Sequence, residues 1–219
     1  MDKLNYFIEA FKKLDTCCVS DALDHHGIYG GMETIVPITS NESVICGPAF
    51  TVRYIARGSA KRTIGDFLDD VKSGQVIVID NQGRTDCTIW GDIMSFTATM
   101  KEIAGTVIHG VCRDVKMIRE LKYPVYAKGH FMVTGKDRVE LDAVNVPISI
   151  EKAQICPGDL ILADCNGVVV IPKDQWEPVL KTAKEIDQKE KEIIAEVKRG
   201  LSLAEARKKT GYHHLQTHR

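Results

Sequence analysis

The chain has 219 residues, which suits a single domain with a substantial hydrophobic core. Its formal net charge of -1 provides no global field that would attract nucleic acid or an anionic membrane. No stretch approaches the roughly 20 apolar residues that a membrane-spanning helix needs, so we expect neither nucleic acid nor a membrane as a partner.

The first part of the chain contains both helix and strand patterns. Apolar residues at helical spacing predict helices, and continuous apolar runs between turn residues predict buried strands. In chain order, the predictions are a helix over 3–14, a short helix over 20–26 that Ser20 caps and Gly27 ends, a strand over 44–55, a helix over 62–72 and a strand over 75–80.

The second part begins with a predicted loop and ends in a long helix. In chain order, the predictions are a loop over 81–91, a helix from Asp92 to about 104, a strand over 106–110, a helix over 115–121, a strand over 124–129, short strands and turns over 135–165, a strand over 167–172, an amphipathic helix over 173–199 and a short helix from Ser202. The turn-rich stretch before the last strand indicates antiparallel pairing.

The alternation of strands and helices in the middle of the chain predicts α/β layers with much parallel sheet. No repeat, low-complexity tract or linker interrupts the chain. We therefore predict one domain over 1–219, with a C-terminal helical arm over about 173–219.

Two short segments carry candidate chemistry. WGDIM places Asp92 at the start of a predicted helix, and VCRDV places Arg113 and Asp114 just after a buried strand. The twenty residues between Asp92 and Arg113 suffice for a helix out and a strand back. The three side chains can therefore meet at the carboxyl ends of the strands, where α/β sheets usually bind ligands.

The chemistry of these residues suits a metal-bound acid. Two carboxylates supply the hard oxygen ligands that Mg²⁺ and Mn²⁺ prefer. The guanidinium of Arg113 offers a planar fork for a carboxylate or an enolate oxygen, and the backbone N–H groups of Ile93 and Met94 at a helix start favour an anion. The residues alone also fit a second interpretation, in which Asp92 caps a helix and Arg113 forms a surface ion pair with Asp114.

Glu190 interrupts the apolar stripe of the predicted C-terminal helix. The stripe comprises Trp176, Leu180, Ala183, Ile186, Ile194 and Val197. Glu190 lies four residues from both Ile186 and Ile194, so it belongs to the same face of the helix. A carboxylate there is costly unless it meets a cation, a metal site or solvent. The pattern leaves open whether Glu190 serves a site or lies in water.

The seven cysteines are scattered, odd in number and without a C-x-x-C pair. This pattern differs from that of a disulfide framework or a structural zinc site, and it favours a reducing compartment. The N-terminal segment MDKLNYFIEAFKKLD lacks the uninterrupted apolar run of a secretory signal. We therefore expect a cytoplasmic protein, in which Cys112 serves packing.

Several motifs, taken in their order, resemble the family that joins the regulator of ribonuclease activity A to the 4-hydroxy-4-methyl-2-oxoglutarate aldolases. The motifs are LDTCCVSDAL (14–23), GPAFTV (47–52), WGDIM (90–94), GVCRDV (110–115), PVYAKG (124–129), CPGDLILAD (156–164) and NGVVVIP (166–172). The pattern and the resemblance together predict an α/β fold, a layered α-β-β-α sandwich with a mixed, partly parallel sheet and a long C-terminal helix.

The resemblance implies a role for each candidate residue. Asp114 would bind a divalent metal cation, Mg²⁺ or Mn²⁺, and Asp92 would hold metal-bound water. Arg113 would contact a 2-oxo acid, whose carboxylate would lie against Gly91 and the amides of Ile93 and Met94.

The resemblance also implies a homotrimer or a dimer of trimers, with sites between subunits. A neighbouring subunit's C-terminal helix would bring a glutamate to the metal. Glu190 matches best, and Glu192 and Glu185 remain alternatives.

The implied activity is that of a class II pyruvate aldolase. It would cleave 4-hydroxy-2-oxo acids such as 4-hydroxy-4-methyl-2-oxoglutarate to pyruvate, and it would also decarboxylate oxaloacetate. One alternative is a non-catalytic regulator that binds a ribonuclease; that branch tends to lack the full acidic set, which is intact here. Another is a lyase for a different 4-hydroxy-2-oxo acid.

Overall fold

The computed structural model describes residues 2–39, 44–58 and 65–210. The helices are α1 (Lys3–Phe11), α2 (Thr16–His25), α3 (Asp92–Met100), α4 (Val115–Glu120), α5 (Trp176–Lys198) and α6 (Leu203–Thr210), with short 3₁₀ helices η1 (Asp66–Asp70) and η2 (Lys173–Gln175). Within these ranges, no helix has the length and apolar character needed to cross a membrane.

Most strands form one mixed sheet. The strands are β1 (Val36–Pro37), β2 (Ile45–Ala56), β3 (Val76–Thr88), β4 (Gly105–Cys112), β5 (Val125–His130), β6 (Val139–Val144), β7 (Ile148–Ile150), β8 (Ala153–Ile155), β9 (Leu160–Asp164) and β10 (Gly167–Ile171). Their order is β1-β5-β4-β3-β2-β9-β10, with β6 also paired to β2 and with β7–β8 as a separate hairpin. Strands β2 to β5 are parallel, and β1, β6, β9 and β10 pair antiparallel.

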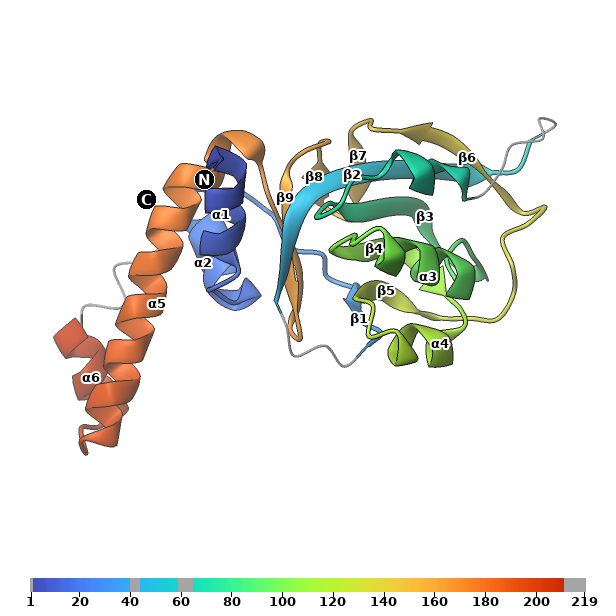
Figure 1. Cartoon of the computed structure of the whole chain (residues 1–219). Helices are drawn as coiled ribbons and strands as arrows, with labels where there is room; N and C mark the ends of the chain where they lie inside the picture. The colour runs from blue at the N-terminus through green and yellow to red at the C-terminus, as the bar shows by residue number, and fades with distance from the viewer. Residues whose placement is uncertain (1, 40–43, 59–64, 211–219) are drawn as a thin grey trace.

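Three hydrophobic cores lie between the layers of helices and strands that Figure 1 shows. Ile77 and Ile108 belong to a core on the side of the parallel strands that α3 and α4 cover. Val78 and Val107 point to the opposite face, where they share a core with β7–β8 and with Val170 of β10. Side chains alternate between faces along a strand, so each parallel strand contributes to both cores.

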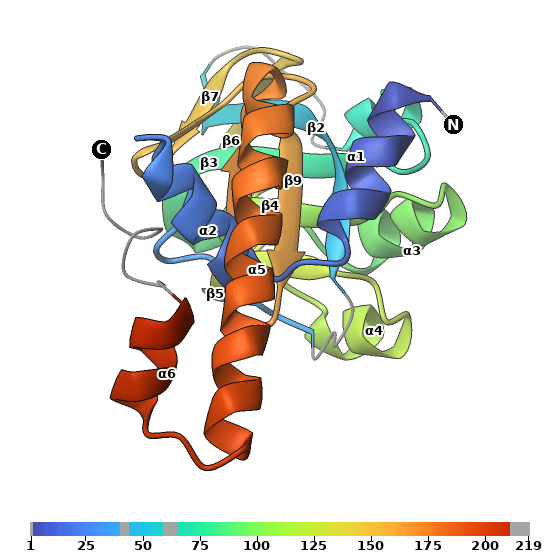
Figure 2. The ribbon, with the colours of Figure 1, turned by 90° about the vertical axis from the view of Figure 1, so that its left-hand side faces the viewer.

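The third core lies between β9–β10 and the helices α1, α2 and α5. Leu162 and Val169 of the strands share it with Phe11, Val19 and Ile186 of the helices. The order of layers is therefore α3–α4, parallel strands, β9–β10, and α1–α2–α5. This arrangement confirms the predicted α-β-β-α sandwich with a partly parallel sheet and a long C-terminal helix. The C-terminal half of α5 projects beyond the sheets together with α6 (Figures 1 and 2).

The second helix begins earlier than predicted. It starts at Thr16, with Asp15 as the cap accepting a hydrogen bond from Cys18 N at 2.7 Å, and Ser20 lies within it. Asp164 of β9 also fixes the start, because its carboxylate accepts hydrogen bonds from Thr16 N and Oγ1 at 2.8 and 2.7 Å. The predicted cap at Ser20 was wrong because this partner is distant in the sequence.

The predicted loop over 81–91 is mostly strand. After Asp80 the chain makes a bulge in which Gln82 and Gly83 adopt left-handed backbone angles. Pairing with β4 then resumes, with Arg84 opposite Gly110. The pattern does not show this extension because polar residues occupy a strand whose pairing depends on its neighbour.

Other boundaries differ by a few residues or by helix type. The predicted helix over 62–72 is the short η1, and 62–64 lie outside the described residues. The helix that starts at Asp92 ends at Met100, because Glu102 adopts a left-handed backbone and Ile103 N bonds back to Ala98 O. A 3₁₀ turn over Lys173–Gln175 precedes α5.

The apolar stripe of α5 is buried along only part of its length. Trp176, Leu180, Ala183 and Ile186 are buried, as predicted, together with Val179, Thr182 and Ile193. Ile194 and Val197 are 54% and 42% exposed, so the second half of the stripe is not buried as predicted in a single chain. The reason is that this half projects beyond the sheets (Figure 2).

Candidate active site

Two loops at the carboxyl ends of β3 and β4 bring the predicted residues together. The first leads from β3 through Gly91 into α3, whose first residue is Asp92. The second places Arg113 and Asp114 directly between β4 and α4. Arg113 N donates a 3.0 Å hydrogen bond to Trp90 O, which holds the two loops together.

Asp114 connects the candidate side chains. Its Oδ2 accepts a hydrogen bond from Asp92 N at 3.2 Å and lies 3.2 Å from Arg113 Nε. Asp92, Arg113 and Asp114 are therefore neighbours, as the spacing of the two motifs predicts. The ion pair of the second interpretation is also present, so the function of these residues depends on what surrounds them.

The two amides expected to bind an anion differ in this structure. Ile93 N donates to Asp92 Oδ1 at 2.7 Å, so this amide already has an acceptor. Met94 N has no acceptor within the described part of the chain. Amides in the first turn of a helix lack intrahelical partners, so Met94 N is available to a ligand.

A hydrogen-bonded support behind the site was not predicted from the sequence. Thr88 Oγ1 accepts from Trp90 N at 3.2 Å and lies 3.0 Å from Trp90 O and 2.8 Å from Val111 O. Trp90 Nε1 donates to Ser95 Oγ, which donates to Gly91 O, each at 2.8 Å. These buried contacts fix the turn that precedes Asp92. A threonine two residues before a tryptophan carries no sequence signal for this role.

The backbone at Gly91 lies so close to the Asp114 carboxylate that no side chain fits between them. A Cβ atom on Gly91 would lie 2.5 Å from Asp114 Oδ2 and 3.3 Å from Arg113 Nε. Asp114 itself has left-handed backbone angles, φ 57° and ψ 36°. Such angles are costly for residues other than glycine, although Asp and Asn tolerate them best. The local backbone thus holds a carboxylate in a place that a regular helix start would not give it.

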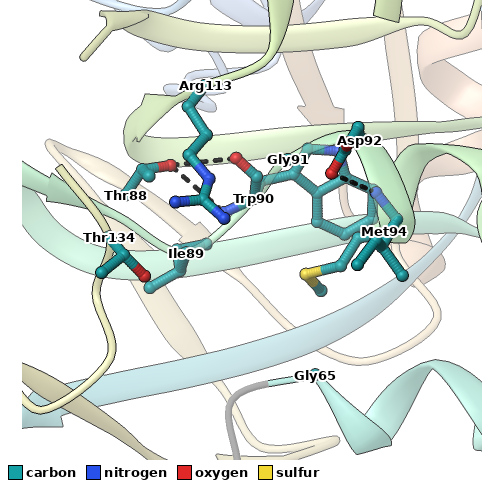
Figure 3. A pocket seen from close by; sticks show the side chains of 10 residues that line it. Gly65, Thr88, Ile89, Trp90, Gly91, Asp92, Met94, Arg113 and Thr134 are labelled. Carbon is teal, nitrogen blue, oxygen red and sulfur yellow. Dashed lines mark hydrogen bonds between the residues drawn. The ribbon is translucent and has the colours of Figure 1, made fainter. Parts of the chain in front are cut away.

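A cavity of about 230 Å³ opens beside these residues (Figure 3). It is lined by Gly65, Thr88, Ile89, Trp90, Gly91, Asp92, Ile93, Met94, Arg113 and Thr134. Thr134 and the guanidinium of Arg113 lie at one end of the view, and Asp92 and Met94 lie at the other. The volume is below the roughly 300–1,000 Å³ of pockets for drug-sized ligands, so a compact molecule fits best.

Asp92 and Asp114 are two carboxylates whose surroundings can be compared with the needs of a cation. Within the described ranges, no group of three or more His, Cys, Asp or Glu side chains is arranged to hold a metal ion. Asp114 Oδ2 receives the contacts from Asp92 N and Arg113 Nε, and no described donor contacts Asp114 Oδ1. This free hard oxygen suits Mg²⁺ or Mn²⁺.

Glu190 lies on the other side of the same chain. It is half-buried on α5, across the sheets from α3 (Figure 1). Burial raises the pKa of the Cys18 thiol to about 12, with smaller contributions from Asp15 and Glu190, which places Glu190 near α2. Glu190 therefore lies away from Asp92 and Asp114 of its own chain.

Two residues beside the site have structural partners. Burial raises the pKa of Cys112 to about 12, so its thiol stays neutral and packs in the core, as predicted. His109 Nδ1 lies 3.2 Å from Asp80 Oδ1 on the adjacent strand. Neither residue lines the cavity.

Exposed apolar side chains lie on the two helices that begin at the site. Ile93, Phe96 and Met100 follow one face of α3 and are 77%, 56% and 69% exposed. Met117 of α4 is 42% exposed. Several large apolar side chains so close together are typical of a protein–protein contact surface.

Residues 16–170 match the family described as RraA-like, Aldolase/RraA. The chain belongs to this family. Its site motifs, WGDIM and GVCRDV, lie inside the matched region. Membership confirms the resemblance on which the expected site residues were named.

Named relatives of this Aldolase/RraA chain include two bacterial proteins. Over 86% of the chain it is 43% identical to Protein DlpA of Legionella pneumophila, but the match spans only 31% of DlpA, about a third of its length. It is 40% identical, over 81% of the chain and 82% of the relative, to a Halalkalibacterium halodurans protein named provisionally as a 4-hydroxy-4-methyl-2-oxoglutarate aldolase. The name of the second relative suggests a lyase.

A solved structure has the same fold. An uncharacterized protein from Pseudomonas syringae superimposes with a TM-score of 0.85 at 39% identity. The match covers 93% of the Aldolase/RraA chain and 97% of the other. The layered fold is therefore that of an experimentally determined relative.

Proposed function

We propose that the chain is a divalent-metal-dependent carbon–carbon lyase. It releases pyruvate from 4-hydroxy-2-oxo acids such as 4-hydroxy-4-methyl-2-oxoglutarate, and it decarboxylates oxaloacetate. The observation that carries this proposal is the contact of Asp114 with both Asp92 N and Arg113 Nε beside a compact cavity. The guanidinium of Arg113, the carboxylate of Asp92 and a free amide line this cavity, with Asp114 in contact with both residues, and this set suits a small 2-oxo acid.

Asp114 and Asp92 are the residues that would hold Mg²⁺ or Mn²⁺, directly or through water. When bound, such a cation supplies Lewis acidity that polarises the 2-oxo group. Asp114 suits this role because its Oδ1 has no donor among the described residues, and because hard oxygen ligands match these ions.

Arg113 binds and orients the acid. Its guanidinium lies at one end of the cavity, where it contacts the 2-oxo acid and stabilises the negative charge that develops on the enolate oxygen (Figure 3). Met94 N, at the other end, donates to the substrate carboxylate. Ile93 N joins it only after Asp92 Oδ1 releases its 2.7 Å hydrogen bond.

Bond cleavage needs a proton acceptor at the 4-hydroxyl group. A water molecule held by the carboxylates of Asp92 and Asp114 takes this proton, the 4-hydroxyl carbon becomes the carbonyl of the leaving fragment, and the electron pair of the broken C3–C4 bond forms the pyruvate enolate. Oxaloacetate loses CO₂ to give the same enolate without that proton transfer. In both reactions a proton then reaches C3 of the enolate to give pyruvate.

The same proposal includes assembly into a homotrimer or a dimer of trimers. The described residues of a single chain supply no third carboxylate at the site, while the exposed α3 face and the exposed Ile194 and Val197 of α5 are available for contact. Contact between these surfaces of two copies would bring Glu190 of the partner subunit toward Asp114. The exposed apolar residues on both helices support this contact.

Oxaloacetate provides the first test. Purified protein with Mg²⁺ is expected to release pyruvate, measured continuously by coupling to lactate dehydrogenase. EDTA should abolish the enzyme-dependent rate, and excess Mg²⁺ or Mn²⁺ should restore it. Turnover that persists in EDTA would exclude the metal-dependent mechanism. No turnover of oxaloacetate or of a 4-hydroxy-2-oxo acid, together with inhibition of a ribonuclease, would instead identify a regulator.

Gly91→Ala tests the close approach at Asp114. The added Cβ would displace the Asp114 carboxylate and Arg113, because it would lie 2.5 Å from the first and 3.3 Å from the second. A displacement of about 1 Å is expected to lower kcat/KM for pyruvate release by about 10²-fold without unfolding the protein. Gly31→Ala is the matched control, since no atom lies within 4 Å of its added Cβ. Equal rates in both variants would contradict the proposed arrangement.

A further inference from the structure

A groove between α1 and α5 lies away from the candidate active site. The two helices run side by side on the face of the molecule opposite α3 and α4 (Figures 1 and 2). The groove has a volume of about 470 Å³ and is lined by Lys3, Tyr6, Phe7, Glu177, Leu180, Lys181 and Lys184. The proposed lyase reaction uses none of these residues.

The rim of the groove is positively charged. Three ammonium groups, those of Lys3, Lys181 and Lys184, face a single carboxylate, Glu177. None of these lysines forms an ion pair with a carboxylate of the described residues. Lys3 and Lys184 instead lie over aromatic rings, at 6.0 Å from the Phe7 centroid and 5.9 Å from that of Tyr6. An anion in the groove would relieve the repulsion between these cations.

The floor of the groove is apolar and fixed. Phe7 and Leu180 are both 4% exposed, so the core holds them in place. Phe7 also packs on Trp176, with ring centroids 5.6 Å apart. The ring of Tyr6 is 49% exposed and forms an open side. A ligand with an apolar body can therefore bury this ring without rearranging the core.

The length of the groove limits its occupant. Glu177 and Lys184 are separated by seven residues of helix, or about 10 Å, and Lys3 and Phe7 by about 6 Å. A helix docked through anchors from i to i+7 would need the same length, so the volume of the groove decides in favour of a small ligand. A ring system or a medium-length chain matches the length, and the volume falls in the range of small-molecule pockets.

We propose that the α1–α5 groove binds a small amphipathic carboxylate, aromatic or medium-chain, at a site separate from the lyase centre. The apolar body lies on Tyr6, Phe7 and Leu180, and Lys181 and Lys184 bind the carboxylate. The compact polar acids of the proposed reaction have no apolar body to cover this floor. The inference therefore stands independently of the proposed reaction.

Naphthalene-1-carboxylate is a suitable probe, and its uncharged amide is the matched ligand control. Isothermal titration calorimetry with the full chain should show saturable binding of the carboxylate and about tenfold weaker binding of the amide. Tryptophan emission should change on binding, because Trp176 packs against Phe7. Equal affinities for the two ligands, or no binding of either, would overturn the proposal.

Two double variants locate the site. Lys181→Gln with Lys184→Gln should raise the dissociation constant of the carboxylate by about tenfold, while Lys198→Gln with Lys208→Gln removes the same charge outside the groove and should leave it unchanged. Tyr6→Ala should also weaken binding, because it removes apolar contact area. Unchanged affinity in the groove variants would overturn the proposal. So would a change of assembly mass in those variants without ligand binding, since that result would identify the groove as a contact between copies.

Discussion

Arg113→Ala is expected to lower kcat for pyruvate release from oxaloacetate by about 10²–10³-fold. Among the described residues that line the candidate cavity, Arg113 has the only cationic side chain, and its Nε lies 3.2 Å from Asp114 Oδ2. Its removal takes away charge stabilisation that is strongest when the enolate forms, so kcat falls more than KM rises. Steady-state kinetics with coupled detection of pyruvate measures both parameters.

Two further variants separate the role of Arg113 from general charge effects. Arg113→Lys keeps the charge but loses the planar fork, so it should recover only a small part of the activity. Arg84→Ala, in the preceding strand, removes an arginine that pairs with Asp86 at 2.7 Å and does not line the cavity. Its rate should stay close to that of the unmodified protein. Full activity in Arg113→Ala would contradict the mechanism.

Mixing two inactive variants is expected to restore activity. Asp114→Asn removes a proposed metal-binding oxygen while preserving a side chain that tolerates the left-handed backbone at this position. Glu190→Gln removes the carboxylate proposed to reach the neighbouring site. Each variant alone should be inactive. In hybrids formed by co-expression, about a quarter of the sites would combine an intact Asp114 with an intact Glu190 of the partner subunit.

The control mixes two variants whose substitutions lie in the part of the site that one and the same chain supplies. Asp114→Asn mixed with Arg113→Ala should recover no activity, because Arg113 and Asp114 are adjacent in one chain and every site lacks one of them. Tagged variants allow hybrids to be purified before the assay. An inactive Asp114→Asn and Glu190→Gln hybrid would show that Glu190 does not reach a neighbour, and Glu192→Gln and Glu185→Gln would then be tested in its place.

Local patterns predicted most helices and strands correctly. The run QVIVID and the stripe from Trp176 to Ile186 are strand and helix, because the period of apolar residues reports which face is buried. Predictions of element boundaries failed where the boundary depends on a hydrogen-bonding partner far away in the sequence. Asp164 fixes the start of α2 from 148 residues away, and pairing with β4 extends β3 past Asp80. Propensity carries no information about such partners.

The candidate site likewise has features that the sequence predicted and features that it did not. The segment between Asp92 and Arg113 predicted that these two residues lie close together, because one helix and one strand return the chain to the same edge of the sheet. The support from Thr88 and the hydrogen bond between Ile93 N and Asp92 Oδ1 became visible only in three dimensions. Both depend on atomic distances that spacing along the chain does not specify.

The amino-acid sequence by itself determined the layered α/β fold, the family and the residues at the centre of the candidate site. These follow from periodicity and from motif order, which are properties of the chain read in one dimension. Only the tertiary structure decided that Gly91 must leave room for the Asp114 carboxylate and that Glu190 lies across the sheets from its own Asp114. Close approach and separation in space arise from packing between distant segments, and no local pattern encodes them.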